Sequence, residues 1–268
     1  MRICRFREEI YLQSIQNIKL KGAGNVRDFG GLKNKHGKMI NPHMFLRGSV
    51  LNDISYGDAD TLTHTYEVKH IIDLRTHTEI REKPDREIDG VEWTHIPLLT
   101  SAMLGITHEK DLDNKNVEIP ELPAIYRKIV SNPFSIEKLK EVFEVICDDK
   151  REGALLWHCT EGKDRCGLVS ALFLYMLDVD MDTIFDDYVY TNTVSAAKGK
   201  KAYWKVFLST GDKSRAEAAR DAYIADRKYL EAAFEEIEMR YGTLDNFMEQ
   251  ELLITPQVKQ KMLKRATR

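Results

Sequence analysis

The chain has 268 residues, of which 43% are apolar and 31% are charged, and its formal net charge is -3. These values are typical of a globular protein with one large domain, or one domain with a substantial insertion. Because there is no basic excess to neutralise phosphates at scale, the composition gives no reason to expect a nucleic-acid partner. No run of about eighteen apolar residues occurs, so no transmembrane segment is predicted.

The N-terminal residues 1–15 alternate charged and apolar positions, without the continuous apolar stretch or the small-residue cleavage site of a signal peptide. The four cysteines are too few and too scattered for a disulfide framework. We therefore expect a protein of the reducing cytoplasm, and export by a route without a signal peptide stays open.

The first half of the chain predicts short strands separated by loops. Residues 22–38 are rich in glycine and predict loop and hairpin. Residues 44–49 and 69–75 are short apolar runs with an arginine near their ends, which suits buried strands, and 91–98 is a third candidate. Residues 100–120 hold few apolar anchors and predict a long loop, a candidate lid or recognition segment.

The second half is mainly helical. Asn132 and Pro133 are typical of a helix start, and apolar residues then recur at helical spacing as far as Ile146. Residues 153–158 predict a fourth strand, and residues 166–179, apolar nearly all round, predict a buried helix. Four later segments show helix periods or helix starts: 182–198, 215–240, 243–253 and 255–266. Thr243 with Asn246, and Thr255 with Pro256, are typical of helix starts.

This order of elements predicts an α/β fold with a central, mostly parallel sheet flanked by helices and a helical C-terminal third. No internal repeat, low-complexity tract or linker is present. We expect residues 1–268 to form a single domain, with residues 20–180 as its core and 181–268 as a helical extension.

The stretch "HCTEGKDRCG", residues 158–167, lies between the fourth strand and the buried helix. A loop in that place directs backbone N–H groups and a helix N-terminus at one spot, which attracts an anion. The pKa of Cys159 is expected to be lowered in that positive field. The planar guanidinium of Arg165 can donate hydrogen bonds to two phosphate oxygens at once. Thiolate, amides and guanidinium together suit a phosphocysteine mechanism.

These residues resemble the signature loop of the cysteine-dependent protein-tyrosine phosphatase superfamily, His-Cys-(five residues)-Arg. The stretch is similar to the HCxxGKDRTG loop of its bacterial tyrosine-phosphatase-like family. Further similarities are an NxRDxGG element, an LxRS-like strand end, a DLR…E pattern and a C-terminal helical segment, here at 25–31, 46–49, 73–79 and 241–252. The resemblance spans roughly residues 20–265 and implies a protein-tyrosine-phosphatase-like fold.

The resemblance implies three catalytic roles. Cys159 is the expected nucleophile, Arg165 the phosphate clamp and Asp164 the general acid that protonates the leaving oxygen. An acid from the long loop, Asp111 or Asp113, remains an alternative to Asp164.

Other residues of the loop are expected to bind substrate: Thr160, Glu161, Gly162, Lys163, Cys166 and Gly167. Lys163 adds a second positive charge, and family members with this lysine resemble phosphatases that also accept phosphoinositides. His158 is expected to orient the loop and help to hold the thiolate.

Five residues are expected to support the site from other segments: Asn25, Arg27 and Asp28 in the N-terminal loop, and Asp73 and Arg75 after a strand. Functional groups of α/β sheets gather at the carboxyl ends of strands. Buried ion pairs that hold the strands together are an equally good interpretation of these residues.

Cys166 departs from the family pattern, in which a threonine or serine follows the arginine. A thiol is a weaker hydrogen-bond donor than a hydroxyl, so slow hydrolysis of the phosphoenzyme is expected. His158, Cys159 and Cys166 could also be imagined as metal ligands. The C-x-x-C spacing and the second Cys/His cluster of zinc sites are missing, so neither a metal nor a cofactor is predicted.

The sequence thus predicts a phosphatase of phosphoric monoesters, with a phosphorylated protein or a phosphoinositide as partner. Phosphotyrosine is the first expectation, and phosphoserine, phosphothreonine and phosphoinositides are further candidates. Two alternatives are a phosphate-binding module without turnover and a phosphatase of a small metabolite such as an inositol phosphate. The oligomeric state is not predicted.

Overall fold

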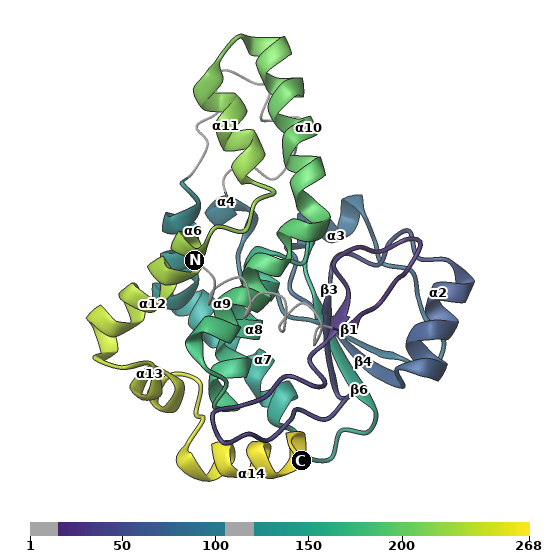
Figure 1. Ribbon diagram of the computed structural model, residues 1–268, viewed down its shortest axis with the longest axis vertical. Helices are drawn as coiled ribbons and strands as arrows, with labels where there is room; N and C mark the ends of the chain where they lie inside the picture. Colours follow the sequence, from purple (N-terminus) through teal and green to yellow (C-terminus); the bar gives the residue numbers. More distant parts are fainter. Residues whose placement is uncertain (1–15, 105–120) are drawn as a thin grey trace.

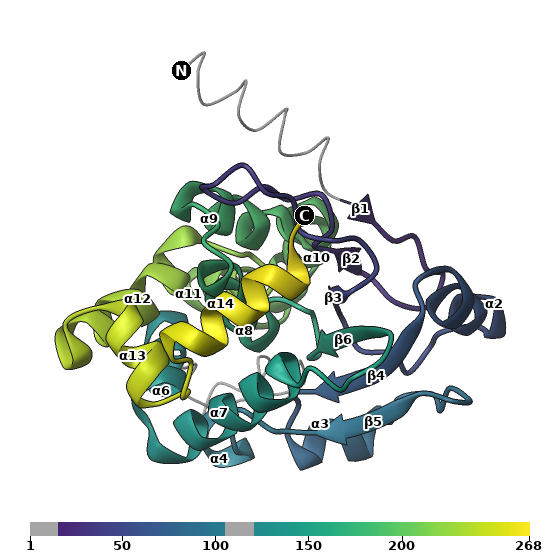
Figure 2. The ribbon, with the colours of Figure 1, turned by 90° about the horizontal axis from the view of Figure 1, so that it is seen from below.

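The structure of the protein is a computed structural model that describes residues 16–104 and 121–268. A sheet lies at its centre, with helices on both faces (Figures 1 and 2). None of the helices in these two ranges combines the length and the apolar character needed to cross a bilayer.

The helices cover the sheet and form most of the C-terminal half of the chain. They are α2 (Tyr56–Asp60), the π-helical turn η1 (Thr61–Thr65), α3 (His77–Glu82), α4 (Ser101–Leu104), α6 (Leu122–Ser131), α7 (Pro133–Cys147), α8 (Asp164–Met176), α9 (Met181–Tyr190), α10 (Asn192–Thr210), α11 (Lys213–Asp221), α12 (Arg227–Tyr241), α13 (Leu244–Gln250) and α14 (Pro256–Ala266).

The sheet has six strands in the order β1-β2-β3-β6-β4-β5. Their bounds are Gln16–Asn17, Arg27–Asp28, Phe45–Gly48, Val68–Asp73, Glu92–His95 and Ala154–His158 for β1 to β6. β3, β6, β4 and β5 are mutually parallel, whereas β1 and β2 pair antiparallel at one edge. The expected mostly parallel sheet is confirmed.

Side chains alternate between two cores along the central strands, as the pleat requires. On β6, Leu155 and Trp157 enter the large core that includes α7, α8 and α12. Ala154 and Leu156 face the smaller core beside η1. Figures 1 and 2 show α2 on one side of the sheet and α8 and α12 on the other. The sheet is therefore buried on both faces, which explains its continuous apolar runs.

The four predicted strands and the helix starts at Asn132, Thr243 and Thr255 are confirmed. Each of these three residues accepts a hydrogen bond from a backbone N–H in the first turn of its helix. The predicted buried helix at 166–179 is α8, which starts two residues earlier, at Asp164. α2, η1, α3, α4 and α6 were not predicted, and α4 falls at the start of the predicted loop at 100–120. The helical segment predicted at 182–198 is divided between α9 and α10, which are separated at Thr191.

The prediction of one helix over residues 215–240 is wrong, because residues 222–226 separate α11 from α12. Asn192 holds this connection by two hydrogen bonds, one from its side-chain amide to the carbonyl of Ala225 and one from the N–H of Ala225. Asp226 then caps α12 by accepting from the N–H of Lys228. Tertiary contacts and a new cap therefore override a helical periodicity that runs through the break.

α10 and α11 form a helical hairpin that projects from the body of the molecule (Figure 1). We call residues 192–221 the α10–α11 hairpin. The two helices pack closely at Gly199, where an added Cβ would lie 3.1 Å from the carbonyl oxygen of Arg220.

Candidate active site

The loop at residues 159–163 links β6 to α8 at the carboxyl end of the parallel strands. Three successive carbonyls of this loop are held by other segments. The N–H of Val50 donates to Thr160, the amide of Asn25 to Glu161 and Gly162, and Arg47 to Gly162. Each trans peptide directs the next N–H away from its own carbonyl. The N–H groups of residues 161–163 therefore point away from these partners, as an anion-binding loop requires.

Gly162 is required for this loop conformation. Its φ is +66°, and an added Cβ would lie 2.6 Å from the carbonyl oxygen of Gly48. Gly167, in the first turns of α8, is equally confined, since a Cβ there would lie 2.8 Å from the ring of Tyr188. Both predicted loop glycines thus let other segments approach the loop.

Cys159 is 2% exposed and directly follows β6. Burial raises the pKa of its thiol to about 11, and neither Arg165 nor the N–H of Cys166, which act in the opposite direction, overcomes this effect. The expectation of a lowered pKa is therefore wrong for this arrangement, because desolvation outweighs the positive charge nearby.

Arg165 is held by Glu79 in a two-pronged ion pair. Its Nη1 and Nη2 lie 2.6 and 2.7 Å from the two carboxylate oxygens of Glu79. Thr160 donates its hydroxyl to Glu79 at 2.5 Å and lies 3.4 Å from Nη2 of Arg165. A guanidinium has five N–H groups, so the Nε–H and one N–H of Nη1 are not used by these contacts. Glu79 fixes the plane of Arg165 while leaving donors for a bound phosphate.

Glu79 is itself fixed by the start of α3. Its carboxylate accepts from the N–H of Thr76, and the Thr76 hydroxyl accepts from the N–H of Glu79, which forms a capping box. Burial opposes the charged carboxylate, but Arg165 outweighs it and lowers the pKa of Glu79 well below its usual value. Arg165 therefore has a charged, rigid partner.

The N-terminal loop and β3 brace the catalytic loop through a buried ion cluster. Arg27 Nε and Arg47 Nη1 lie 2.8 and 2.5 Å from the carboxylate of Asp187 on α9. Arg27 also donates to the side-chain oxygen of Asn25 at 2.5 Å, which leaves the amide nitrogen to reach Gly162 at 2.9 Å. Burial opposes the charge of Asp187, but the two arginines outweigh it and lower its pKa.

Asp28 makes hydrogen bonds within the N-terminal segment rather than to the catalytic loop. Its carboxylate accepts from the N–H groups of Gly30 and His43. Burial raises the pKa of Asp28 even though these two hydrogen bonds oppose the shift. Among the N-terminal candidates, Asn25 contacts the catalytic loop directly and Arg27 acts through Asn25.

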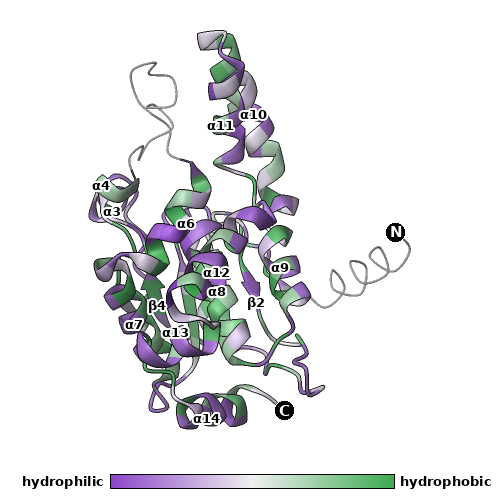
Figure 3. Cartoon of the chain, turned by 90° about the vertical axis from the view of Figure 1, so that its left-hand side faces the viewer, coloured by the Kyte–Doolittle hydropathy of each residue, from purple (hydrophilic) through white to green (hydrophobic). Residues whose placement is uncertain are grey.

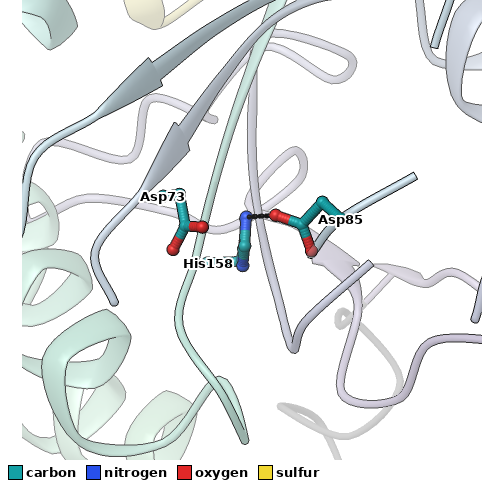
Figure 4. A group of neighbouring side chains, drawn as sticks. All are labelled: Asp73, Asp85 and His158. Carbon is teal, nitrogen blue, oxygen red and sulfur yellow. Dashed lines mark ion pairs between the residues drawn. The ribbon is translucent and has the colours of Figure 1, made fainter. Parts of the chain in front are cut away.

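His158, at the end of β6, lies in a network of buried charges (Figure 4). Its Nε2 is 3.0 Å from the carboxylate of Asp85, and its Nδ1 is 3.2 Å from the carbonyl of Cys159. Arg75 pairs with both Asp73 and Asp85, at 2.6 and 2.8 Å. Burial opposes protonation of the ring, but Asp73 and Asp85 outweigh it and raise the pKa of His158.

Asp73, Asp85 and His158 lie close enough together to suggest a metal site. Arg75 already supplies the positive charge there, because its Nε and Nη2 occupy both oxygens of Asp73 and Nη2 also reaches Asp85. A metal ion would have to displace a buried guanidinium. The donor set therefore fits an ion-pair network that ties β4 and the loop after α3 to His158.

Lys163 does not point at the loop's anion-binding face. Its side chain is 1% exposed, and its Nζ donates to the carbonyls of Asp221 and Ile224, between α11 and α12. It also lies 3.1 Å from Asp164. The lysine that was expected to meet substrate instead joins the catalytic loop to the base of the α10–α11 hairpin, and a direct contact with substrate stays a prediction.

Asp164 is the first residue of α8 and stands beside the loop with its side chain 27% exposed. Its Oδ1 accepts from the hydroxyl of Tyr126 on α6 at 2.8 Å. The hydroxyls of Tyr126 and Tyr188 lie 2.6 Å apart, so the carboxylate is held by a chain of two tyrosines. The alternative acids, Asp111 and Asp113, lie outside the described residues.

Cys166 is fully buried behind the loop. Its thiol donates to the carbonyl of Trp157 at 3.6 Å. Since a thiol has a single hydrogen, this contact leaves none for the sulfur of Cys159. In this geometry Cys166 donates no hydrogen bond that would stabilise a thiolate at Cys159.

Sequence reasoning named Glu79 only as part of the DLR…E pattern, without a role, and did not single out four further residues of the site: Asp85, Tyr126, Asp187 and Tyr188. Glu79 stands in the DLR…E pattern, and its spacing from Thr76 is that of a capping box, so a signal for it was present. The other four come from distant segments and carry no local pattern.

The comparisons with known proteins agree with this geometry. A family model described as the tyrosine phosphatase family matches residues 18–268. The chain belongs to this family, and it is therefore an enzyme that hydrolyses phosphoric monoesters. The resemblance noted in the sequence is confirmed.

Two relatives carry the name tyrosine-protein phosphatase. One, from Cupriavidus necator, is 24% identical over 241 residues, which cover 88% of this chain and 84% of that protein. The other, from Nostoc commune, is 31% identical over 147 residues, which cover 54% of this chain and 47% of that protein. Among solved structures, the catalytic core of the PP-IP phosphatase Siw14 of S. cerevisiae is 13% identical, with a TM-score of 0.37, covering 76% of this chain and 97% of that one.

Replacement of Glu79 by glutamine keeps the shape of the side chain but removes the charge that holds Arg165. We expect kcat/KM to fall about 10- to 100-fold, because a small displacement of a positioned group is costly. Steady-state kinetics on p-nitrophenyl phosphate measure this. Glu82→Gln, at an exposed position of the same helix, is the matched control. In an Arg165→Ala background the Glu79 change should have no further effect, and a full additional loss there would contradict the positioning role.

Replacement of Cys166 by threonine places a hydroxyl behind Cys159, the expected nucleophile. We expect the wild type to show a burst of product followed by a slow steady state, because phosphoenzyme hydrolysis is limiting. In Cys166→Thr the steady-state rate should rise and the burst should shrink. Stopped-flow measurement of p-nitrophenolate release compares the two. Identical kinetics in both proteins would contradict the expectation that Cys166 slows hydrolysis of the phosphoenzyme.

Proposed function

We propose that the protein acts through a phosphocysteine formed on Cys159, with phosphotyrosine as its first substrate class. Phosphoserine, phosphothreonine and phosphoinositides are further candidates. One observation carries the proposal: Cys159 and Arg165 belong to a single strand–loop–helix unit in which Glu79 fixes Arg165. The names of the two relatives, both tyrosine-protein phosphatases, support the choice of phosphotyrosine.

In the first step the sulfur of Cys159 attacks phosphorus and the bond from phosphorus to the leaving oxygen breaks. Asp164 gives its proton to that oxygen, while Arg165 and the loop N–H groups stabilise the charge on the equatorial oxygens. In the second step a water oxygen attacks phosphorus and the S–P bond breaks. Asp164 takes the proton from the water, which leaves inorganic phosphate and the Cys159 thiolate.

The raised pKa of Cys159 bears on the first step, because the attacking species is the thiolate. A substrate monoester that arrives as a dianion can accept the thiol proton as it enters the loop. The phosphoryl group keeps this proton through both steps and returns it to the sulfur as inorganic phosphate leaves, so the thiolate exists only while a phosphate group is bound.

The position of Lys163 favours substrates with one phosphate over those with several. Its ammonium is engaged by the connection between α11 and α12 rather than turned toward the loop. The support that this lysine lends to phosphoinositides is thereby reduced. We place the enzyme in the cytoplasm on the strength of its cysteine usage.

The first test is hydrolysis of p-nitrophenyl phosphate in EDTA by the wild type and by Cys159→Ser. We expect activity that survives the chelator and falls below about one part in 10³ in the variant, since serine is a far weaker nucleophile at neutral pH. Loss of activity in EDTA would contradict metal-free chemistry. Absence of activity in both proteins would favour a phosphate-binding module, which phosphopeptide affinity would then reveal.

The role of Asp164 is tested by Asp164→Asn with two substrates. General acid catalysis typically contributes about 10²- to 10⁴-fold, and it matters most for a strongly basic leaving group. We expect kcat on a phosphotyrosine peptide to fall about 100-fold or more, and far less on p-nitrophenyl phosphate, whose phenolate is a weaker base. Equal losses on both substrates would point to an acid elsewhere, with Asp111→Asn and Asp113→Asn as the next variants.

A further inference from the structure

The α10–α11 hairpin is basic, whereas the chain as a whole is acidic. It contains seven basic and three acidic residues, a net charge of +4, whereas the whole chain is -3 and the remaining residues therefore carry -7. α10 has four lysines and no acidic residue: Lys198, Lys200, Lys201 and Lys205. α14 carries the same net charge, with Lys259, Lys261, Lys264, Arg265 and no acidic residue, so charge alone does not distinguish the hairpin. The hairpin differs from α14 in that it projects from the body of the molecule (Figure 1).

One face of α10 combines these lysines with large apolar side chains. Val194, Lys201 and Leu208 are spaced seven residues apart, and Trp204 lies between the last two on the same face. Trp204 is 49% exposed, Leu208 79% and Val194 39%. Nine large hydrophobic residues are exposed among residues 16–104 and 121–268, and three of them lie here. Figure 3 shows hydrophobic and hydrophilic residues together along the hairpin.

The opposite face of α10 already accounts for the packing of the hairpin. Val206 and the partly buried Tyr203 and Phe207 pack against Ala216 and Ala219 of α11. Trp204 makes ring contacts with Tyr203 and Phe207 of this cluster, with centroids 5.4 and 6.0 Å apart. Folding of the hairpin therefore does not require the exposed positions of Trp204 and Leu208 to be apolar.

We propose that this exposed face of α10, which we call the docking face (Val194, Lys201, Trp204 and Leu208, flanked by Lys198 and Lys205), binds the surface of an anionic lipid bilayer. A helix with lysines beside Trp and Leu is suited to lie in the plane of a membrane interface. Tryptophan is favoured at the headgroup level, and lysines are attracted by anionic lipids. An acidic protein partner would use the lysines but gives no reason for an exposed Leu208.

The docking face is connected to the catalytic loop. Lys198 pairs with Glu161 of that loop at 2.8 Å, and Lys163 donates to Asp221 at the end of α11. The hairpin thus rises from the same end of the sheet as the active site. A bilayer bound along the docking face would hold the catalytic loop close to the membrane surface, where a phosphorylated lipid or the phosphorylated tail of a membrane protein is presented.

The test is co-sedimentation of the full chain with phosphatidylcholine vesicles, with and without phosphatidylserine. We expect binding to the anionic vesicles alone, weakened by added salt. Each lysine near an anionic surface strengthens binding about fivefold, so Lys201→Glu with Lys205→Glu should weaken it at least about tenfold. Leu208→Ser should weaken it about tenfold as well, because burial of one leucine is lost.

Matched controls lie at the other end of the molecule or on another helix. Lys33→Glu with Lys35→Glu makes the same charge change in an exposed loop, and Met239→Ser replaces a side chain that is 73% exposed on α12. Both should bind like the wild type. Fluorescence gives a second readout: vesicles should shift the tryptophan emission to the blue, and Trp204→Phe should abolish the shift while retaining most binding.

Turnover of p-nitrophenyl phosphate, a soluble substrate, should be unchanged in every hairpin variant, so the result does not depend on the proposed function. The proposal is overturned if anionic vesicles are not bound, or if the hairpin variants and the controls bind alike. Binding to an acidic polypeptide such as polyglutamate, without binding to vesicles, would likewise overturn it and assign the face to an acidic protein.

Discussion

The buried carboxylate of Asp187 is the contact on which the geometry of the site depends. It holds Arg27 and Arg47 together, and through them it joins the N-terminal loop, β3 and α9 to the catalytic loop. Removal of one partner from such a buried group typically costs about 3–5 kcal/mol, because the remaining charges are left uncompensated. Here the loss would also release the carbonyl of Gly162, so stability and loop geometry depend on the same ion cluster.

Arg165 and Asp164, which are proposed to act on the phosphate group, and His158, which precedes Cys159, are each positioned by a residue from another segment. Glu79 on α3 orients Arg165, the pair Tyr126 and Tyr188 holds Asp164, and Asp85 holds His158. Such arrangements place functional groups accurately because every supporting side chain is itself buried and bonded. They also explain why a ten-residue stretch is insufficient for the chemistry and why the fold must bring at least five segments to the end of β6.

Local patterns in the sequence were sufficient for the strands, for the family and for the position of the loop at residues 159–163, whose catalytic role stays a prediction. The strand before Cys159 is a continuous apolar run, and the loop is a contiguous motif. The helix break at residues 222–226 could not be predicted, because Asn192, which holds it, lies on another helix. The role of Asp187 could not be predicted either, because its partners Arg27 and Arg47 lie more than a hundred residues away in the sequence. The position of Lys163 was missed for the same reason: its spacing suits a substrate contact, and only tertiary structure shows the carbonyls that bind it.

The backbone of Asn25 has consequences for which sequences can carry this site. Its φ is +55°, a left-handed conformation that glycine, asparagine and aspartate tolerate best. Its side chain must also accept from Arg27 and donate to two carbonyls. Glycine would fit the backbone but offers no amide, and aspartate would turn an anion toward two carbonyl oxygens. Backbone conformation and hydrogen bonding together favour asparagine over every other amino acid at this position.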